Sequence, residues 1–207
     1  MKNIVKIFAA AAVLAGCAST KVIDTNDQSQ VEGMSHVMQL EFRDWERAAD
    51  EAVADMLSSG AVNNPNGGRY VLVVSRITNN TMQRLDTDEL VKKIRTQLLR
   101  SGKVVVTTAV GLDGGEDPMV IAARQLRDST EVNQANVAKK GTIVAPDLSL
   151  SGKLIQKNLK LDKSFLSSSK ERVEYYIQLS LTDLNTGLAL WENETPIIKE
   201  GKKAPTW

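Results

Sequence analysis

Two short runs of β-branched residues flank a helical pattern between residues 70 and 108, and this arrangement constrains the fold more than any other part of the sequence. The first run, YVLVVSRI from Tyr70 to Ile77, is bounded by turn-forming residues and suits a buried strand. The second run, KVVVTT, begins at Lys103. A strand, a helix and a strand of these lengths form a βαβ unit, whose two strands are parallel. The sequence therefore predicts an α/β fold.

Two helices are predicted, one before and one after the first strand in the sequence. Residues 42–59 place apolar side chains at helical spacing, and Gly60 follows as a stop signal. The next helix begins near Asp86 or Thr87, either of which can cap it, and ends before Gly102. The apolar side chains of this helix all fall on one face: Leu90, Val91, Ile94, Leu98 and Leu99.

Two further helical segments are expected after the second strand. In DPMVIAARQLRD, Asp117 precedes Pro118 at a helix start, and a polar helical segment is expected near residues 131–139. The acidic residues Asp113, Glu116 and Asp117 do not have the spacing of a calcium-binding EF-hand loop. They are therefore predicted to cap a helix, and no metal site is predicted.

The second half of the chain changes from helical to alternating periodicity. Leu148, Leu150 and Leu154 alternate with polar residues, and the same alternation runs from Val173 to Leu181. A turn at residues 185–187 precedes a last, short strand at residues 188–192. The expected fold is a mixed sheet of about four to five strands, with a βαβ unit, a C-terminal antiparallel meander and flanking helices.

Trp191 has two open interpretations. Leu188 and Leu190 are expected to face the core, and on a regular strand Trp191 then projects from the opposite face. A helix that covers the indole is one explanation. Because surface tryptophans are enriched at binding hot spots, Trp191 is also a speculative partner contact.

The N-terminus has the pattern of an export signal. Lys2 and Lys6 precede an apolar run, and small residues precede Cys17, the only cysteine of the 207 residues. The stretch LAGC resembles the lipobox of bacterial lipoprotein precursors, which implies removal of residues 1–16 and acylation of Cys17, with palmitate among the chains. Residues 17–40 are predicted to be the lipidated cysteine and a flexible tether, since they are polar and have no periodic pattern.

The mature chain is predicted to be one domain at residues 41–195 with a tail at residues 196–207. Removal of two lysines with the signal changes the net charge from +1 to −1, and aromatic residues make up 4% of the chain. Such a composition argues against a nucleic-acid partner. Because the single histidine, His36, falls in the predicted tether, neither a histidine-based catalytic triad nor a zinc site is expected. No catalytic, cofactor or metal residues are predicted, and the domain is expected to be a monomer.

Several stretches, taken in order, resemble the LpoB-type activators of class A penicillin-binding proteins. The stretches are the lipobox, DW at Asp44 and Trp45, VLVVSRITNNT, LRSGKVVVTT and IQLSLTDLNTGLALWE. This resemblance implies a domain similar to the N-terminal domain of TolB. It also implies a non-catalytic outer-membrane lipoprotein that faces the periplasm and stimulates a peptidoglycan synthase. The tether is shorter than in enterobacterial members, and residues 157–172 look like an insertion.

Two other functions stay open at this stage. Export lipoproteins of the curli type share a related α/β domain, so a role in envelope secretion or assembly is the alternative. A lipid-anchored hydrolase that uses aspartate or glutamate alone is the third, and it requires paired acidic side chains in a cleft.

Overall fold

The computed structural model describes residues 39–111, 116–160 and 170–202. In this part of the chain no helix has the length and apolar character needed to cross a membrane. The predictions for the signal segment, Cys17, His36 and Asp113 fall outside the described residues, as does most of the predicted tether. They stay predictions.

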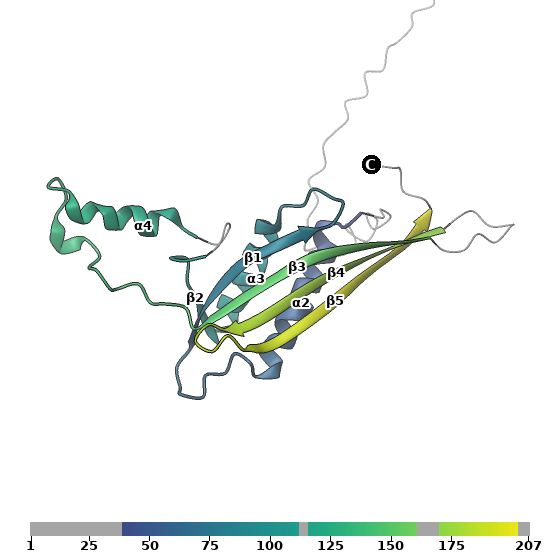
Figure 1. Ribbon diagram of the computed structural model, residues 1–207, viewed down its shortest axis with the longest axis horizontal. Helices are drawn as coiled ribbons and strands as arrows, with labels where there is room; N and C mark the ends of the chain where they lie inside the picture. Colours follow the sequence, from purple (N-terminus) through teal and green to yellow (C-terminus); the bar gives the residue numbers. More distant parts are fainter. Residues whose placement is uncertain (1–38, 112–115, 161–169, 203–207) are drawn as a thin grey trace, which may run out of the picture. The chain divides into compact units, whose positions relative to one another are not determined.

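A five-stranded mixed sheet forms the centre of the domain, in the order β2-β1-β3-β4-β5 (Figure 1). Strand β1 runs parallel to both of its neighbours, β2 and β3, whereas β3, β4 and β5 pair antiparallel. The predicted α/β fold, with its βαβ unit and C-terminal meander, is confirmed. The strands are β1 (Tyr70–Asn80), β2 (Val104–Val106), β3 (Leu148–Lys160), β4 (Lys170–Asp183) and β5 (Ala189–Lys202).

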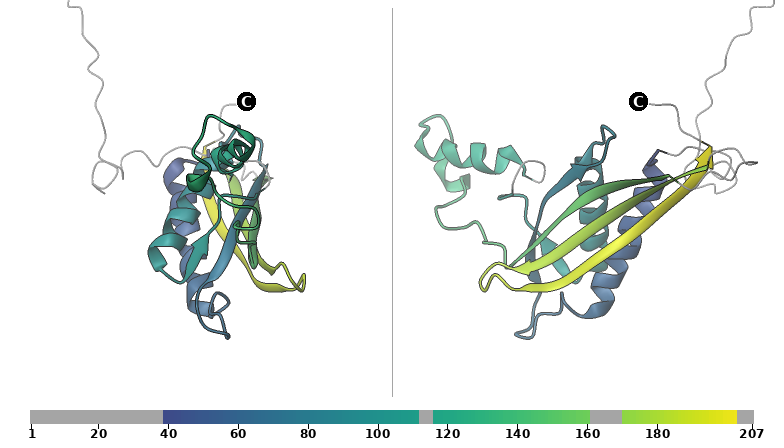
Figure 2. Two further views of the ribbon diagram at one scale, coloured as in Figure 1. Left: turned by 90° about the vertical axis from the view of Figure 1, so that its left-hand side faces the viewer. Right: turned by 45° about the vertical axis from the view of Figure 1, so that its right-hand side comes forward.

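Helices α2 (Phe42–Ser59) and α3 (Thr87–Ser101) lie on the same side of the sheet (Figure 2). Local sequence explains their ends. The Asp86 carboxylate accepts a hydrogen bond from the backbone of α3, as a capping residue should. Gly60 and Gly102 end the two helices with φ of 82° and 68°, values that glycine adopts without a steric penalty.

The hydrophobic core lies between this helical layer and the sheet. Every second residue of β4 faces the core, which confirms the predicted alternation: Val173, Tyr175, Ile177, Leu179 and Leu181 are buried. The residues between them are half-buried on the other face. Since two helices cover one face and polar side chains follow the other, the sheet has one dry side and one side open to solvent.

Strands β3, β4 and β5 are longer than the sequence pattern indicates. Residues 157–160 extend β3 and residues 170–172 extend β4, so part of the stretch interpreted as an insertion belongs to the sheet. The last strand was expected at residues 188–192 but continues to Lys202. The predicted boundary at residue 195 therefore falls inside a strand that pairs with β4 along most of its length.

The connection between β2 and β3 contributes no buried side chain in the described residues of 107–147. Helix α4 (Pro118–Gln125) forms as expected, and Asp117 caps it by accepting a hydrogen bond from the Met119 backbone at 2.9 Å. Two short 3₁₀ turns follow, η2 (Leu126–Asp128) and η3 (Gln134–Asn136). The expectation of a helical segment near residues 131–139 is wrong. That stretch has no apolar face to bury, and local propensity alone does not stabilise so short a helix.

Gly152 in β3 is required by the close approach of β4. A Cβ atom at this position would lie 2.4 Å from the carbonyl oxygen of Gln178 and 2.6 Å from Cδ2 of Leu179. We expect Gly152→Ala to destabilise the domain by about 1–3 kcal/mol, the usual cost of overpacking. Thermal unfolding with Ser151→Ala as the neighbouring control measures this, and equal melting temperatures for Gly152→Ala and wild type would contradict it.

Candidate functional site

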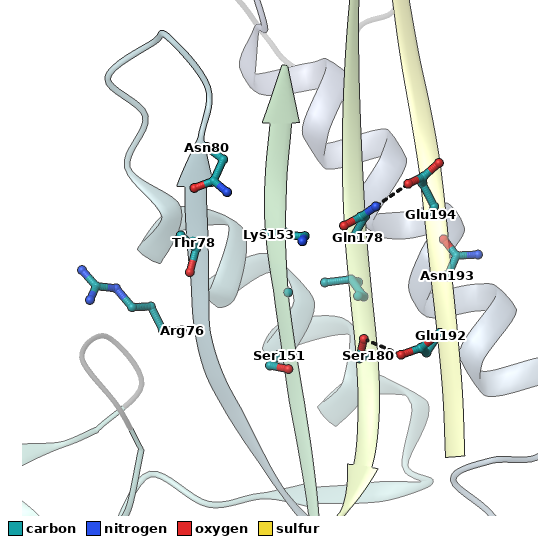
Figure 3. A pocket seen from close by; sticks show the side chains of 12 residues that line it. Arg76, Thr78, Asn80, Ser151, Lys153, Gln178, Ser180, Glu192, Asn193 and Glu194 are labelled. Atoms are coloured by element: carbon teal, nitrogen blue, oxygen red, sulfur yellow. Dashed lines mark hydrogen bonds between the residues drawn. The ribbon is translucent and has the colours of Figure 1, made fainter. Parts of the chain in front are cut away.

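The helix-free face of the sheet contains an open groove with a volume of about 790 Å³. Side chains from β1, β3, β4 and β5 line it (Figure 3). Most of these side chains are the polar residues that alternate with the buried core residues along each strand. Because successive side chains of a strand point to opposite faces, the alternation that places apolar residues in the core also places these polar residues in the groove. We call this surface the polar groove.

Side chains of the polar groove form rows across the strands. In the first row Thr78 is opposite Lys153, Lys153 is opposite Gln178, and Gln178 is opposite Glu194. The amide of Gln178 donates a hydrogen bond to the Glu194 carboxylate (Figure 3). The row thus runs from a hydroxyl group on β1 through a cation and an amide to a carboxylate on β5.

A second row repeats this pattern at the next outward-facing position. Ser151 is opposite Ser180, and Ser180 is opposite Glu192. The hydroxyl of Ser180 donates to Oε1 of Glu192 at 3.3 Å (Figure 3). Both rows end in a carboxylate on β5, which makes this wall of the groove acidic.

Lys153 supplies a positive charge at the centre of the polar groove. Its side chain is exposed, and no hydrogen bond or ion pair of Lys153 is found within the described residues. Adjacent strands are about 4.8 Å apart, so β3 and β5 are separated by about 10 Å. The amine of Lys153 and the carboxylates of β5 are therefore about 10 Å apart across the groove.

Tyr176 lies beyond the rows on the same face. Nζ of Lys157 lies 4.4 Å from the centroid of its ring, a cation–π contact. The phenol donates a hydrogen bond to Glu174, and this bond, followed by desolvation, raises the pKa of Tyr176. A tyrosine phenol is protonated across the neutral pH range, so Tyr176 is a hydrogen-bond donor there.

The side chains of the polar groove are hydrogen-bond donors and acceptors. The two acidic residues of the rows already accept hydrogen bonds from neighbouring side chains. Across the described ranges, no group of three or more His, Cys, Asp or Glu side chains is placed to hold a metal ion. Lys153, Gln178, Glu192 and Glu194 were not singled out from the sequence, although the alternating pattern already placed Lys153 and Gln178 on the outer face.

Trp191 is buried at 9% exposure, against helix α2. Its indole N–H donates a hydrogen bond to Oδ2 of Asp55 at 2.8 Å. The pairing of β4 with β5 is irregular here: Leu181 is opposite Trp191, and Thr182 is opposite Ala189. Trp191 therefore packs in the core, as the helix-covered interpretation proposed. In this position its ring is not available as a surface anchor for a partner.

The alternation that places Trp191 in the core also reverses the expected orientation of two leucines. Leu188 and Leu190 were expected to face the core, and this expectation is wrong: they are 63% and 41% exposed. Leu184, on the other side of the turn, is 47% exposed. We call Leu184, Leu188 and Leu190 the leucine tip. Three large apolar side chains within seven residues are therefore exposed at and beside one turn.

Hydrogen bonds within the turn hold the leucine tip in place. Oδ1 of Asp183 accepts from the backbone of Asn185 and Thr186 at 2.8 and 3.0 Å. Gly187 has φ of 73° and donates to the Asp183 carbonyl. The tip is thus supported by its own backbone rather than by burial of its leucines.

The chain enters the domain at the other end of β4. Lys199 Nζ donates to the carbonyl of Gln39 at 2.7 Å, and Lys199 is opposite Val173 in the sheet. The tip begins after Asp183 at the far end of the same strand. Ten residues of extended chain span about 33 Å. The leucine tip and the N-terminal entry point are therefore separated by most of the length of the sheet.

The described chain is a two-layer α/β domain with an open polar sheet face and exposed leucines at one turn. Residues 44–197 match the family described as peptidoglycan-synthase activator LpoB. The chain belongs to this family, which confirms the resemblance seen in the sequence. A comparison with curated protein sequences found no match.

Solved structures of similar fold include members of this family. The LpoB C-terminal domain from Escherichia coli is 15% identical, with a TM-score of 0.42 over 74% of this chain and 98% of that one. The corresponding domain from Salmonella enterica is 17% identical, with a TM-score of 0.44 and the same coverage. Lipoprotein GNA1162 from Neisseria meningitidis is 12% identical, with a TM-score of 0.33 over 66% of this chain and 88% of that one.

Proposed function

We propose that this protein is a non-catalytic lipoprotein that binds a class A penicillin-binding protein and stimulates peptidoglycan synthesis. The match to the activator family over residues 44–197 is the observation that carries the proposal. The groove chemistry agrees with a binding role, because it offers several hydrogen-bond donors and acceptors to a partner or ligand.

The leucine tip is the proposed contact surface for the synthase. Binding hot spots are formed by side chains that lose most of their exposed area on association, and apolar side chains contribute most where water is excluded. Leu184, Leu188 and Leu190 have such area to lose. Their turn is held by hydrogen bonds from its backbone to the Asp183 carboxylate, so little ordering entropy is lost on binding.

The leucine tip lies at the opposite end of β4 from the point where the described chain begins. We propose that Cys17 is acylated and that the protein is held at the outer membrane, facing the periplasm, with residues 18–38 as the tether, since Gln39 and Leu40 already contact the domain. As a flexible coil, 21 residues have a typical end separation of about 23–28 Å. The tether enters at the Gln39 end of the sheet, and the tip lies about 33 Å further along it.

Stimulation requires the domain to bind the active conformation of the synthase more tightly than the inactive one. A ligand that binds both conformations equally shifts neither population. A difference of about 1.4 kcal/mol is enough for a tenfold shift, and a modest protein interface supplies this.

We expect purified residues 18–207 to bind a class A penicillin-binding protein from the same organism and to raise its rate of glycan polymerisation by up to about tenfold. Binding is measured by surface plasmon resonance, and polymerisation by incorporation of labelled lipid-linked precursor. The domain alone should not hydrolyse peptidoglycan. An unchanged polymerisation rate with every class A synthase of the organism would contradict the activator function.

A further inference from the structure

The polar groove has no apolar anchor of the kind that protein interfaces use. Leu179 is the one large apolar residue that lines it, and only 2% of its surface is exposed. Protein interfaces have apolar centres with aromatic and arginine hot spots. The exposed guanidinium of Arg76 lies at the β1 side of the lining, and the other accessible groups of the groove are hydroxyl, amide, ammonium and carboxylate groups. These groups suit a highly polar ligand.

The separation of charge across the groove selects a ligand that carries both signs. Lys153 on β3 favours a carboxylate, whereas Glu192 and Glu194 on β5 favour an amino group about 10 Å away. Each of these glutamates accepts a single side-chain hydrogen bond in the structure. A carboxylate offers about four acceptor sites, so both retain capacity for a ligand.

We propose that the polar groove binds peptidoglycan itself, through a stem peptide that carries carboxylates and a free amino group. The sugars of peptidoglycan carry hydroxyl and acetamido groups, which can exchange hydrogen bonds with the serine and threonine hydroxyls and the Gln178 amide of the groove. Such a ligand places its ammonium group against β5 and a carboxylate against Lys153.

Two surfaces would then have separate partners, with the synthase at the leucine tip and its product polymer in the groove. The inference depends on the proposed function only for bringing the domain close to peptidoglycan. Binding to the polymer is measured without any synthase, so either proposal can fail while the other holds.

The test is co-sedimentation of the mature lipoprotein, solubilised in detergent, with purified sacculi. We expect the lipoprotein to sediment with the sacculi. A soluble disaccharide-tetrapeptide with a free amino group should inhibit this binding. Acetylation of the sacculus amino groups should weaken binding at least about fivefold, because the carboxylates of β5 lose their cationic partner. Glycan strands stripped of their peptides should compete poorly, which distinguishes recognition of the peptide from recognition of the sugars alone.

The decisive variant is Lys153→Gln/Glu194→Gln, which leaves the net charge unchanged and should weaken sacculus binding at least about tenfold. Lys92→Gln/Glu51→Gln is the matched control, since these exposed residues lie on the helical layer. Serine substitutions at the leucine tip should leave sacculus binding unchanged.

Three results would overturn the proposal: no sedimentation of the wild type, equal sedimentation of the groove variant, or loss of sedimentation by the control variant as well. If the groove variant instead lost synthase binding and kept sacculus binding, the groove would be a contact for the protein partner.

Discussion

Replacement of Leu184, Leu188 and Leu190 by serine should weaken synthase binding by about a hundredfold or more. Hot-spot truncations cost about 2 kcal/mol or more each, and costs of neighbouring positions are not additive, so a total near 3 kcal/mol is a conservative expectation. The three side chains are largely exposed in the free domain. Their replacement removes area that becomes buried only in the complex, and the measurement is the dissociation constant by surface plasmon resonance.

A matched triple variant separates an interface effect from a general loss of surface leucines. Met82, Leu99 and Leu159 are exposed to a similar extent and lie on a loop, a helix and a different strand. Their serine variant should bind the synthase within about twofold of wild type, since surface substitutions usually change stability by less than about 0.5 kcal/mol. If both triple variants lost binding equally, or if neither lost it, the leucine tip would not be the contact surface.

Trp191→Ala should destabilise the folded domain by about 3–5 kcal/mol, the usual cost of truncating a buried tryptophan. The indole is buried against α2, and its N–H has a hydrogen-bond acceptor in Asp55. For a domain of this size the melting temperature should fall by about 10 °C or more. Differential scanning calorimetry measures the change, and far-UV circular dichroism confirms that the residual fold is native.

Graded variants distinguish packing from the hydrogen bond. Trp191→Phe keeps most of the apolar volume, and Asp55→Ala leaves the buried indole N–H without its acceptor at a cost of about 1–3 kcal/mol. Because both changes remove the same bond, the double variant should be less destabilised than the sum of the single variants. If Trp191→Ala left the stability unchanged and weakened synthase binding, Trp191 would instead be a contact residue of the interface.

The periodicity of the sequence was sufficient to predict the main elements. Apolar spacing located α2 and α3, and Asp86, Asp117, Gly60 and Gly102 marked their ends and the start of α4. These signals are local, because a cap or a left-handed glycine depends on backbone atoms within a few residues of it. The polar segment near residues 131–139 was misassigned since its helical propensity had no apolar face to support it.

Family membership was also accessible from the sequence, through the order of its motifs and the turn residues of LTDLNTG. The structure gives that turn a physical basis in the hydrogen bonds of Asp183 and the positive φ of Gly187. Asp183 and Gly187 are therefore the residues whose types this turn uses. The motif consequently indicates how the turn folds. The exposed leucines beside it are the residues that can contact a partner.

The sequence by itself determined which residues alternate and where helices begin and end, because these depend on neighbours along the chain. Only the tertiary structure decided the orientation of Trp191 and the leucine tip, since the register of β5 against β4 sets which alternate residues of β5 face the core. It likewise decided that Lys153 and Glu194, 41 positions apart, share one groove. Strand register, which depends on pairing between distant segments, brought them together.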